Sequence, residues 1–239
     1  MTNVLILRTP GTNSDMETAY AFEQAGGEVQ RLHINRVLEK PELLQEFQIL
    51  CFPGGFSFGD DVAAGKILGN LLKTRLIEPL QKFQEADKLI LGMGNGFQVL
   101  VKSGLLLKES ETTLTWNQSG VYTDRWTRLR VEGSKCVFLR GVESLYLPVA
   151  HAEGRFVARN EQTNWQVALK YAPGENPDGS QEDIAGICDP TGRVFGLMPL
   201  PERYIDPLQH PHWTRISPKE RPRFGDGFKL FQNAVGYFR

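Results

Sequence analysis

Residues 88–100 are the segment that most restricts how this chain can fold. They read Lys-Leu-Ile-Leu-Gly-Met-Gly-Asn-Gly-Phe-Gln-Val-Leu, which predicts a buried strand, a tight turn and the start of a helix. Enzymes with this strand–turn–helix unit present a Cys or Ser nucleophile on the strained turn. Here the apex is Gly94. The segment therefore predicts an α/β protein built like a nucleophile elbow, with no nucleophile on it.

Short apolar runs alternate with helical segments through the first hundred residues. The runs of strand length cover residues 4–7, 29–34, 48–52 and 89–91. This alternation predicts a parallel sheet covered by helices. Between residues 62 and 83, apolar side chains recur every three or four positions, so one helical face packs on the sheet. Pro79 is expected to split this region into two helices.

The second half of the chain is predicted to be rich in strands. Short strand patterns bounded by turns run from Trp126 to Val194 and include residues 145–149, 166–169 and 194–197. Residues 206–224 contain four prolines and read as a loop, which leads into an amphipathic helix at 228–238. The 239 residues are expected to form one domain, 1–239.

Composition excludes several classes of protein. Hydrophobic residues make up 41% and charged residues 23%, without an apolar run of membrane-spanning length. The start of the chain enters a strand pattern and lacks the features of a secretory signal, so a cytoplasmic protein is expected. Cys51, Cys136 and Cys188 are widely spaced, which argues against a disulfide framework or zinc site. A net charge of −1 predicts binding neither to nucleic acid nor to a membrane.

Five motifs follow one another along the chain. They are Arg8-Thr-Pro-Gly-Thr-Asn13, Phe52-Pro-Gly-Gly-Phe-Ser-Phe-Gly-Asp60, Asn95-Gly-Phe-Gln98, Ala150-His-Ala-Glu-Gly154 and Met198-Pro-Leu-Pro-Glu-Arg203. Together they resemble the glutamine amidotransferase subunit of phosphoribosylformylglycinamidine synthase, in purine biosynthesis. The resemblance implies a class I (triad) glutamine amidotransferase with a flavodoxin-like α/β/α sandwich and a mostly parallel sheet. It also implies a large synthetase subunit as partner, which receives ammonia released from glutamine, and neither a cofactor nor a metal.

The resemblance identifies three triad positions, of which two are substituted. Such enzymes attack the amide with a Cys thiolate, move protons through a His and orient that His with a carboxylate. Gly94 stands at the Cys position and Leu200 at the His position, whereas Glu202 is the retained carboxylate. Glycine cannot form a thioester and leucine cannot accept a proton. Glutaminase activity at or near zero is therefore expected.

The two substitutions have a physical logic in a chain released from catalysis. Glycine occupies a strained elbow without a Cβ clash, which relieves about 1–3 kcal/mol of backbone strain. Leu200 is expected to fill the space of the missing imidazole rather than point into solvent. The change of two residues to unlike ones favours natural loss over an engineered knockout, although the sequence leaves both origins open.

Other parts of the implied pocket persist. Backbone N–H groups of Gly54 and Gly55, with that of Asn95, are candidates for an oxyanion hole that binds a polar ligand such as glutamine. Gln98 belongs to the same candidate ligand site. The alternative for the two glycines is a tight loop after the third strand. Cys51, on a buried strand, is not expected to replace the lost nucleophile.

Histidines and basic residues elsewhere have two readings each. His151 and Glu153 match a His-x-Glu-Gly-Arg segment of the family, as a loop that anchors substrate or partner, or as a structural histidine with its neighbours. His210 and His212 are a weak metal signal without a nearby carboxylate cluster, and loop packing or surface exposure is expected instead. The basic run from Arg215 to Arg223 reads as a solvated loop, with a phosphate or an acidic partner surface as the alternative.

Three functions are compatible with these residues. The first is a structural subunit that docks on the large synthetase subunit. The second is a pseudoenzyme that binds glutamine or a related metabolite and reports it to a partner. The third is an active glutaminase that uses unrecognised residues, which the substitutions at Gly94 and Leu200 disfavour.

Overall fold

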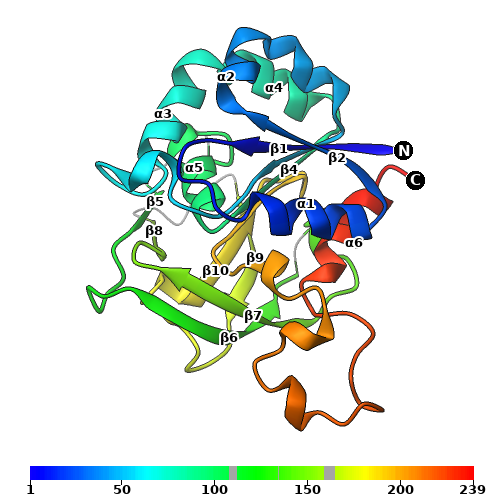
Figure 1. The fold of residues 1–239 in the computed structure, drawn as a ribbon. Helices are drawn as coiled ribbons and strands as arrows, with labels where there is room; N and C mark the ends of the chain where they lie inside the picture. Colours follow the sequence, from blue (N-terminus) through cyan, green and yellow to red (C-terminus); the bar gives the residue numbers. More distant parts are fainter. Residues whose placement is uncertain (108–111, 134, 159–164) are drawn as a thin grey trace.

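A nine-stranded sheet runs through the centre of the molecule (Figure 1). The computed structural model describes residues 1–107, 112–133, 135–158 and 165–239. The first five strands in sheet order are parallel. They are β2 (Gly27–His33), β1 (Thr2–Arg8), β3 (Ile49–Phe52), β4 (Leu89–Met93) and β11 (Val194–Leu197). The four strands that sequence patterns predicted up to residue 91 are thus confirmed as β1 to β4.

The other half of the sheet is antiparallel and comes from the strand-rich second half of the chain. Its strands, in order from β11, are β10 (Ile184–Cys188), β9 (Gln166–Tyr171), β6 (Thr123–Val131) and β7 (Ser144–His151). A separate two-stranded sheet pairs β5 (Thr112–Thr115) with β8 (Arg155–Ala158). The strand predictions at 145–149, 166–169 and 194–197 are confirmed as parts of β7, β9 and β11.

Successive side chains along the parallel strands point to opposite faces of the sheet, which divides the core into two layers. On β1, Val4 and Ile6 pack into one cluster, whereas Leu5 and Leu7 pack into the other. The first cluster is covered by α1 (Asp15–Gln24) and α6 (Phe228–Gly236). The second is covered by α2 (Ile34–Glu39), α3 (Lys66–Arg75), α4 (Ile77–Glu85) and α5 (Asn95–Ser103). The predicted α/β/α sandwich is confirmed (Figure 1).

The break between α3 and α4 lies three residues before the proline that was expected to cause it. Leu76 leaves the helical conformation, with φ −131° and ψ 9°. Pro79 lacks an N–H and would clash with the carbonyl of Arg75 in a continuous helix, so it sits instead in the first turn of α4. The prediction of two helices is confirmed.

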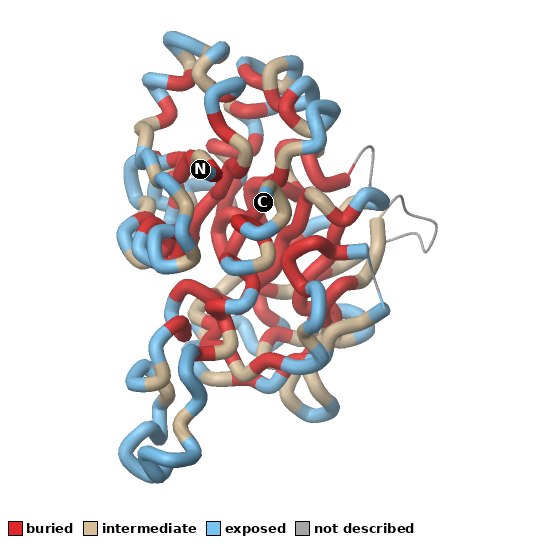
Figure 2. The backbone as a smooth tube through the Cα atoms, turned by 90° about the vertical axis from the view of Figure 1, so that its right-hand side faces the viewer, coloured by how far each residue is buried: buried red, intermediate tan, exposed pale blue. Residues whose placement is uncertain are grey.

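A long irregular segment projects from the body of the molecule. Residues 206–224, called the arm below, contain two short 3-10 turns at Pro207–Gln209 and Trp213–Arg215. Most of the arm is exposed, and it stands away from the sheet (Figures 1 and 2). The predicted loop is confirmed. Among the residues that the structure describes, every helix is too short or too polar to span a bilayer.

Candidate functional site

The elbow connects the end of β4 to the start of α5. Gly94 has φ 52° and ψ −112°, a conformation that suits a residue without a Cβ. Its N–H donates to the carbonyl of Leu197 on the neighbouring β11, at 2.9 Å. Its own carbonyl accepts the N–H of Phe97 at 3.0 Å, which starts the first turn of α5. The strand–turn–helix unit expected from residues 88–100 is therefore present, at the carboxyl edge of the parallel strands.

Leu200 faces the apex of the elbow. A Cβ placed on Gly94 would lie 3.0 Å from Leu200 Cδ2 and 3.9 Å from the Cα of Gly54. The Leu200 side chain is only 6% exposed, so it fills the site as expected and does not point into solvent. Two residues more than a hundred positions apart in the sequence thus meet at one point.

Glu202 lies in the interior, close to Gly54. It is fully buried, and neither carboxylate oxygen has a hydrogen-bond partner among the described residues. Its Oε1 would be 3.6 Å from a Cβ on Gly54. Burial raises the pKa of Glu202 to about 7. Its own backbone N–H, Arg203 and the Ser14 hydroxyl act against this rise and Glu17 adds to it, although neither the N–H nor the hydroxyl reaches its carboxylate with hydrogen-bond geometry. Burial also raises the pKa of the Cys51 thiol well above its usual value, and the nearby Glu202 adds to this effect.

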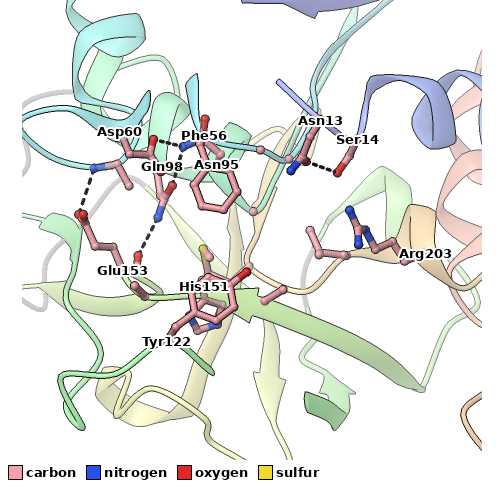
Figure 3. Close-up of a pocket in the computed structure, with 18 residues that line it drawn as sticks. Asn13, Ser14, Phe56, Asp60, Asn95, Gln98, Tyr122, His151, Glu153 and Arg203 are labelled. Atoms are coloured by element: carbon pink, nitrogen blue, oxygen red, sulfur yellow. Dashed lines mark hydrogen bonds between the residues drawn. The ribbon is translucent and has the colours of Figure 1, made fainter. Parts of the chain in front are cut away.

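A cavity of about 160 Å³ opens at the elbow (Figure 3). Eight of the nine residues that the sequence proposed for the site line it; the ninth, Glu202, is buried beyond the wall. The eight are Gly54, Gly55, Gly94, Asn95, Gln98, His151, Glu153 and Leu200. A volume of this size holds a molecule about as large as benzene. The site residues therefore form one pocket large enough for a small metabolite.

Side-chain amides fix one wall of the cavity. Asn95 Oδ1 accepts the N–H of Ser57 at 3.1 Å, and Asn95 Nδ2 donates to Asp60 Oδ1 and Gln98 Oε1, both at 2.9 Å. Gln98 Nε2 donates in turn to the carbonyl of Glu153 at 2.8 Å (Figure 3). In each side chain the amide oxygen accepts a hydrogen bond and the amide nitrogen donates one. These bonds fix which way both amide groups face. Asn95 and Gln98 therefore form the wall of the pocket, and their amide groups are already hydrogen-bonded within the protein.

Glu153 ties two further segments to this wall. Its Oε2 accepts the N–H of Ala64 at 3.1 Å and lies 3.9 Å from Lys102 Nζ. Lys102 also donates to the carbonyl of Ala64. Burial lowers the pKa of Lys102, although the nearby Glu153 opposes that shift. Lys102 was not proposed as a site residue from the sequence. The one signal available was its position as a charged residue in a helix that is otherwise buried.

Two backbone N–H groups remain available at the elbow. Gly55 has φ 138°, and a Cβ there would lie 2.7 Å from the N of Asn13 and 2.8 Å from the carbonyl O of Gly11. Glycine is therefore required, and its N–H donates no hydrogen bond within the described residues. Asn95 is the first residue of α5, so its N–H has no acceptor within the helix. Both groups line the cavity, as an oxyanion hole would require.

His151 uses its ring nitrogens in the interior. Asn117 Nδ2 donates to the carbonyls of His151 (2.9 Å) and Val121 (3.0 Å), which leaves Asn117 Oδ1 as an acceptor. Oδ1 also accepts the N–H of Gly154, so His151 Nδ1, at 3.1 Å, carries the proton and donates. Nε2 is buried, 3.6 Å from Asp178 Oδ2 and beyond hydrogen-bond distance. Burial lowers the pKa of His151, and the ring acts as a structural histidine.

Several lining residues were not proposed from the sequence. They are Asn13, Ser14, Phe56, Asp60, Ala64, Tyr122, Ala150, Ala152, Met198 and Arg203. Asn13, Asp60 and Arg203 belong to the five motifs, so the signal was present, whereas nothing in the sequence singled out Tyr122. Within the described residues, no group of three or more His, Cys, Asp or Glu side chains is arranged to hold a metal.

Comparisons with known proteins agree on one family. Residues 1–238 match the CobB/CobQ-like glutamine amidotransferase domain. The chain is 48% identical to the phosphoribosylformylglycinamidine synthase subunit PurQ of Dehalococcoides mccartyi, over 98% of this chain and 97% of that protein. It is 37% identical to the PurQ subunit of Methanococcus maripaludis, with the same coverage.

Solved structures of related proteins also match this chain. A chain in the structure of PurLQS from Thermotoga maritima superposes with a TM-score of 0.81 at 31% identity, covering 100% of this chain and 99% of that one. A second protein from the same organism, a glutamine amidotransferase, shares the fold with a TM-score of 0.60 at 15% identity, over 99% and 97% of the two chains.

Proposed function

The chain belongs to the glutamine amidotransferase subunits of phosphoribosylformylglycinamidine synthase, and on that premise we propose that it is a catalytically degenerate member. In this proposal it docks on the large synthetase subunit and supports purine synthesis without hydrolysing glutamine. Ammonia then reaches the synthetase from solution or from another source.

The convergence of three positions carries this proposal. A side chain on Gly94 would point at Leu200, and the buried Glu202 lies close by, since Leu200 Cδ2 (3.4 Å) and Glu202 Oε1 (3.6 Å) both approach the Cβ position of Gly54. This is the arrangement that a nucleophile, a base and an orienting carboxylate need. Glycine supplies no atom to attack the amide carbon, and leucine supplies none to take the proton. In this proposal an imidazole N–H at position 200 would donate to Glu202, whose two oxygens have no hydrogen-bond partner among the described residues.

In the described structure, the groups nearest the site are not placed to act as a replacement nucleophile or base. His151 Nδ1 donates to Asn117 and its Nε2 is buried, so it cannot act as a base at the elbow. Cys51 is fully buried, with a raised pKa that keeps it a thiol. Ser14 lines the cavity, but its hydroxyl donates to Asn13 Oδ1 at 3.2 Å and has no base beside it.

The surface around the cavity supports docking. Two segments that contribute lining residues also carry large apolar side chains that are 44–89% exposed. These are Phe56 and Val62 on one segment, and Trp116, Val121 and Tyr122 on the other. Clustered exposed apolar side chains around a pocket are typical of protein interfaces. A partner that covers the cavity would bury them.

The test is ammonia release from glutamine by four forms of the protein, each with and without the large subunit. They are the wild type, Gly94→Cys, Leu200→His and the double variant. We expect the wild type and both single variants to be silent, and the double variant to release ammonia, because it alone has both nucleophile and base. Enzyme-like ammonia release by the wild type would overturn the proposed degeneracy.

A second function is favoured by one observation. The cavity of about 160 Å³ persists, with the N–H groups of Gly55 and Asn95 available to a carbonyl oxygen. We propose binding of intact glutamine or a related amide as the alternative function. Calorimetry should then detect glutamine binding by the wild type, weakened in a Gln98→Leu variant. An absence of heat at millimolar glutamine would eliminate this alternative.

A further inference from the structure

The outer half of the arm has a charge opposite to that of the remaining chain. Residues 213–224 carry four basic side chains and one acidic one, a net charge of +3, whereas the rest of the protein carries −4. Their basic residues are Arg215, Lys219, Arg221 and Arg223. Irregular segments of this length are uncommon in compact proteins and are usually either functional or linkers, and the 3-10 turn at Trp213–Arg215 makes this one an ordered segment.

These cations have no acidic partner in the part of the chain that the structure describes. Within the described residues, none of the four forms an ion pair. Arg221 donates through Nε to the carbonyl of Ile216 at 3.2 Å and lies 5.2 Å from the ring centre of Trp213. Arg223 lies 5.1 Å from the ring centre of Phe224. The charges are therefore displayed beside aromatic rings that are themselves 39% exposed.

The arm is held firmly at its base. The ring of His210 sits among those of Trp126, Tyr146 and Tyr204, with centroids 5.6–6.0 Å apart. Asp206 Oδ1 accepts the N–H of Leu208 at 2.8 Å, as a cap on the first 3-10 turn. An anchored segment loses less conformational entropy on binding than a free one. The charged outer half is thus presented from a fixed base.

The arm starts next to the cavity. It begins three residues after Arg203, which lines the cavity wall and lies 3.7 Å from Glu17 of α1. A partner seated over the exposed apolar side chains of the cavity rim would approach the base of the arm. Arginine and tryptophan side chains are also the residues most enriched at energetic centres of protein interfaces.

From these observations we propose that the arm is a docking element for an acidic surface of the large synthetase subunit. The proposal rests on the docking function proposed above and adds the residues that bind. A protein surface fits better than nucleic acid, because the cations occupy one short segment of a chain with net charge −1 rather than an extended basic face.

The test compares two charge reversals of equal size. The arm variant is Arg215→Glu, Lys219→Glu and Arg223→Glu; Arg221 is kept, because it bonds within the arm. The matched control is Lys73→Glu, Arg75→Glu and Lys82→Glu, on the exposed faces of α3 and α4 at the opposite end of the molecule (Figure 1). Binding of each full-length protein to the purified large subunit is measured at 50 and 200 mM salt, after circular dichroism confirms folding.

We expect the arm variant to bind roughly tenfold more weakly at 50 mM salt, with a smaller difference at 200 mM, and the control to stay within about twofold of wild type. Wild-type binding that the arm variant retains would overturn the role of the arm and leave docking intact. A wild type that does not bind would overturn both proposals. Arm-dependent binding to a single-stranded RNA oligonucleotide, with subunit binding unchanged, would also refute the inference.

Discussion

The buried carboxyl group of Glu202 should make the stability of this protein depend on pH. Burial raises its pKa from 4.5 to about 7 in the folded protein. The folded state therefore holds the proton more tightly than the unfolded chain. The contribution of this group is most favourable below about pH 4.5, is lost as the pH rises from 4.5 to 7, and is constant above that.

The magnitude follows from the size of the shift. One pKa unit corresponds to about 1.4 kcal/mol, so the rise from 4.5 to about 7 corresponds to about 3 kcal/mol in total. Between pH 5 and pH 8 the part lost is about 2–3 kcal/mol, because some ionisation of the unfolded chain has already occurred at pH 5. Full burial means that solvent screening does not reduce this value.

The assay is urea unfolding of wild type and Glu202→Gln at both pH values. Glutamine resembles the protonated acid, so the variant should differ little from wild type at pH 5 and be more stable by about 2–3 kcal/mol at pH 8. Glu23→Gln, on the exposed side of α1, serves as the matched control for the same chemical change. A double difference below about 0.5 kcal/mol would refute the view that Glu202 is buried and unpaired.

Three further substitutions test the geometry of the site and of the arm. Gly55→Ala should cost more than about 2 kcal/mol in thermal or urea unfolding, since its Cβ would lie 2.7 Å from the N of Asn13; a neutral effect would contradict the close approach. Asn117→Leu should cost about 2–4 kcal/mol, because it leaves Gly154 N–H and the His151 ring without their acceptor. Trp126→Ala should loosen the His210 anchor, so limited trypsin digestion should cut within residues 206–224 faster than in wild type, with equal rates arguing against the anchor.

Local sequence patterns were sufficient to predict the first four strands and the elbow. Alternating strand and helix periods define β1 to β4, and the glycines of residues 88–100 define the turn, because these features depend on neighbours in the chain. The convergence of Gly94 and Leu200 required the resemblance to a family, since residues so far apart meet only through the pairing of β4 with β11. The role of Asn117 was not predictable from the sequence. It depends on hydrogen bonds to His151, at the end of β7, and to Gly154, which lie more than thirty residues further along the chain.

The residues that fit at positions 94 and 200 depend on each other, because a side chain at position 94 would contact Leu200. A Cβ at position 94 would come within 3.0 Å of Leu200 Cδ2, so leucine fits best opposite a residue without a side chain. Glycine in turn fits the φ of 52° without strain. Glu202 does not take part in this fit, because leucine cannot donate a hydrogen bond to its oxygens. Its burial without a hydrogen-bond partner is therefore a cost that the apolar packing of positions 94 and 200 leaves uncompensated.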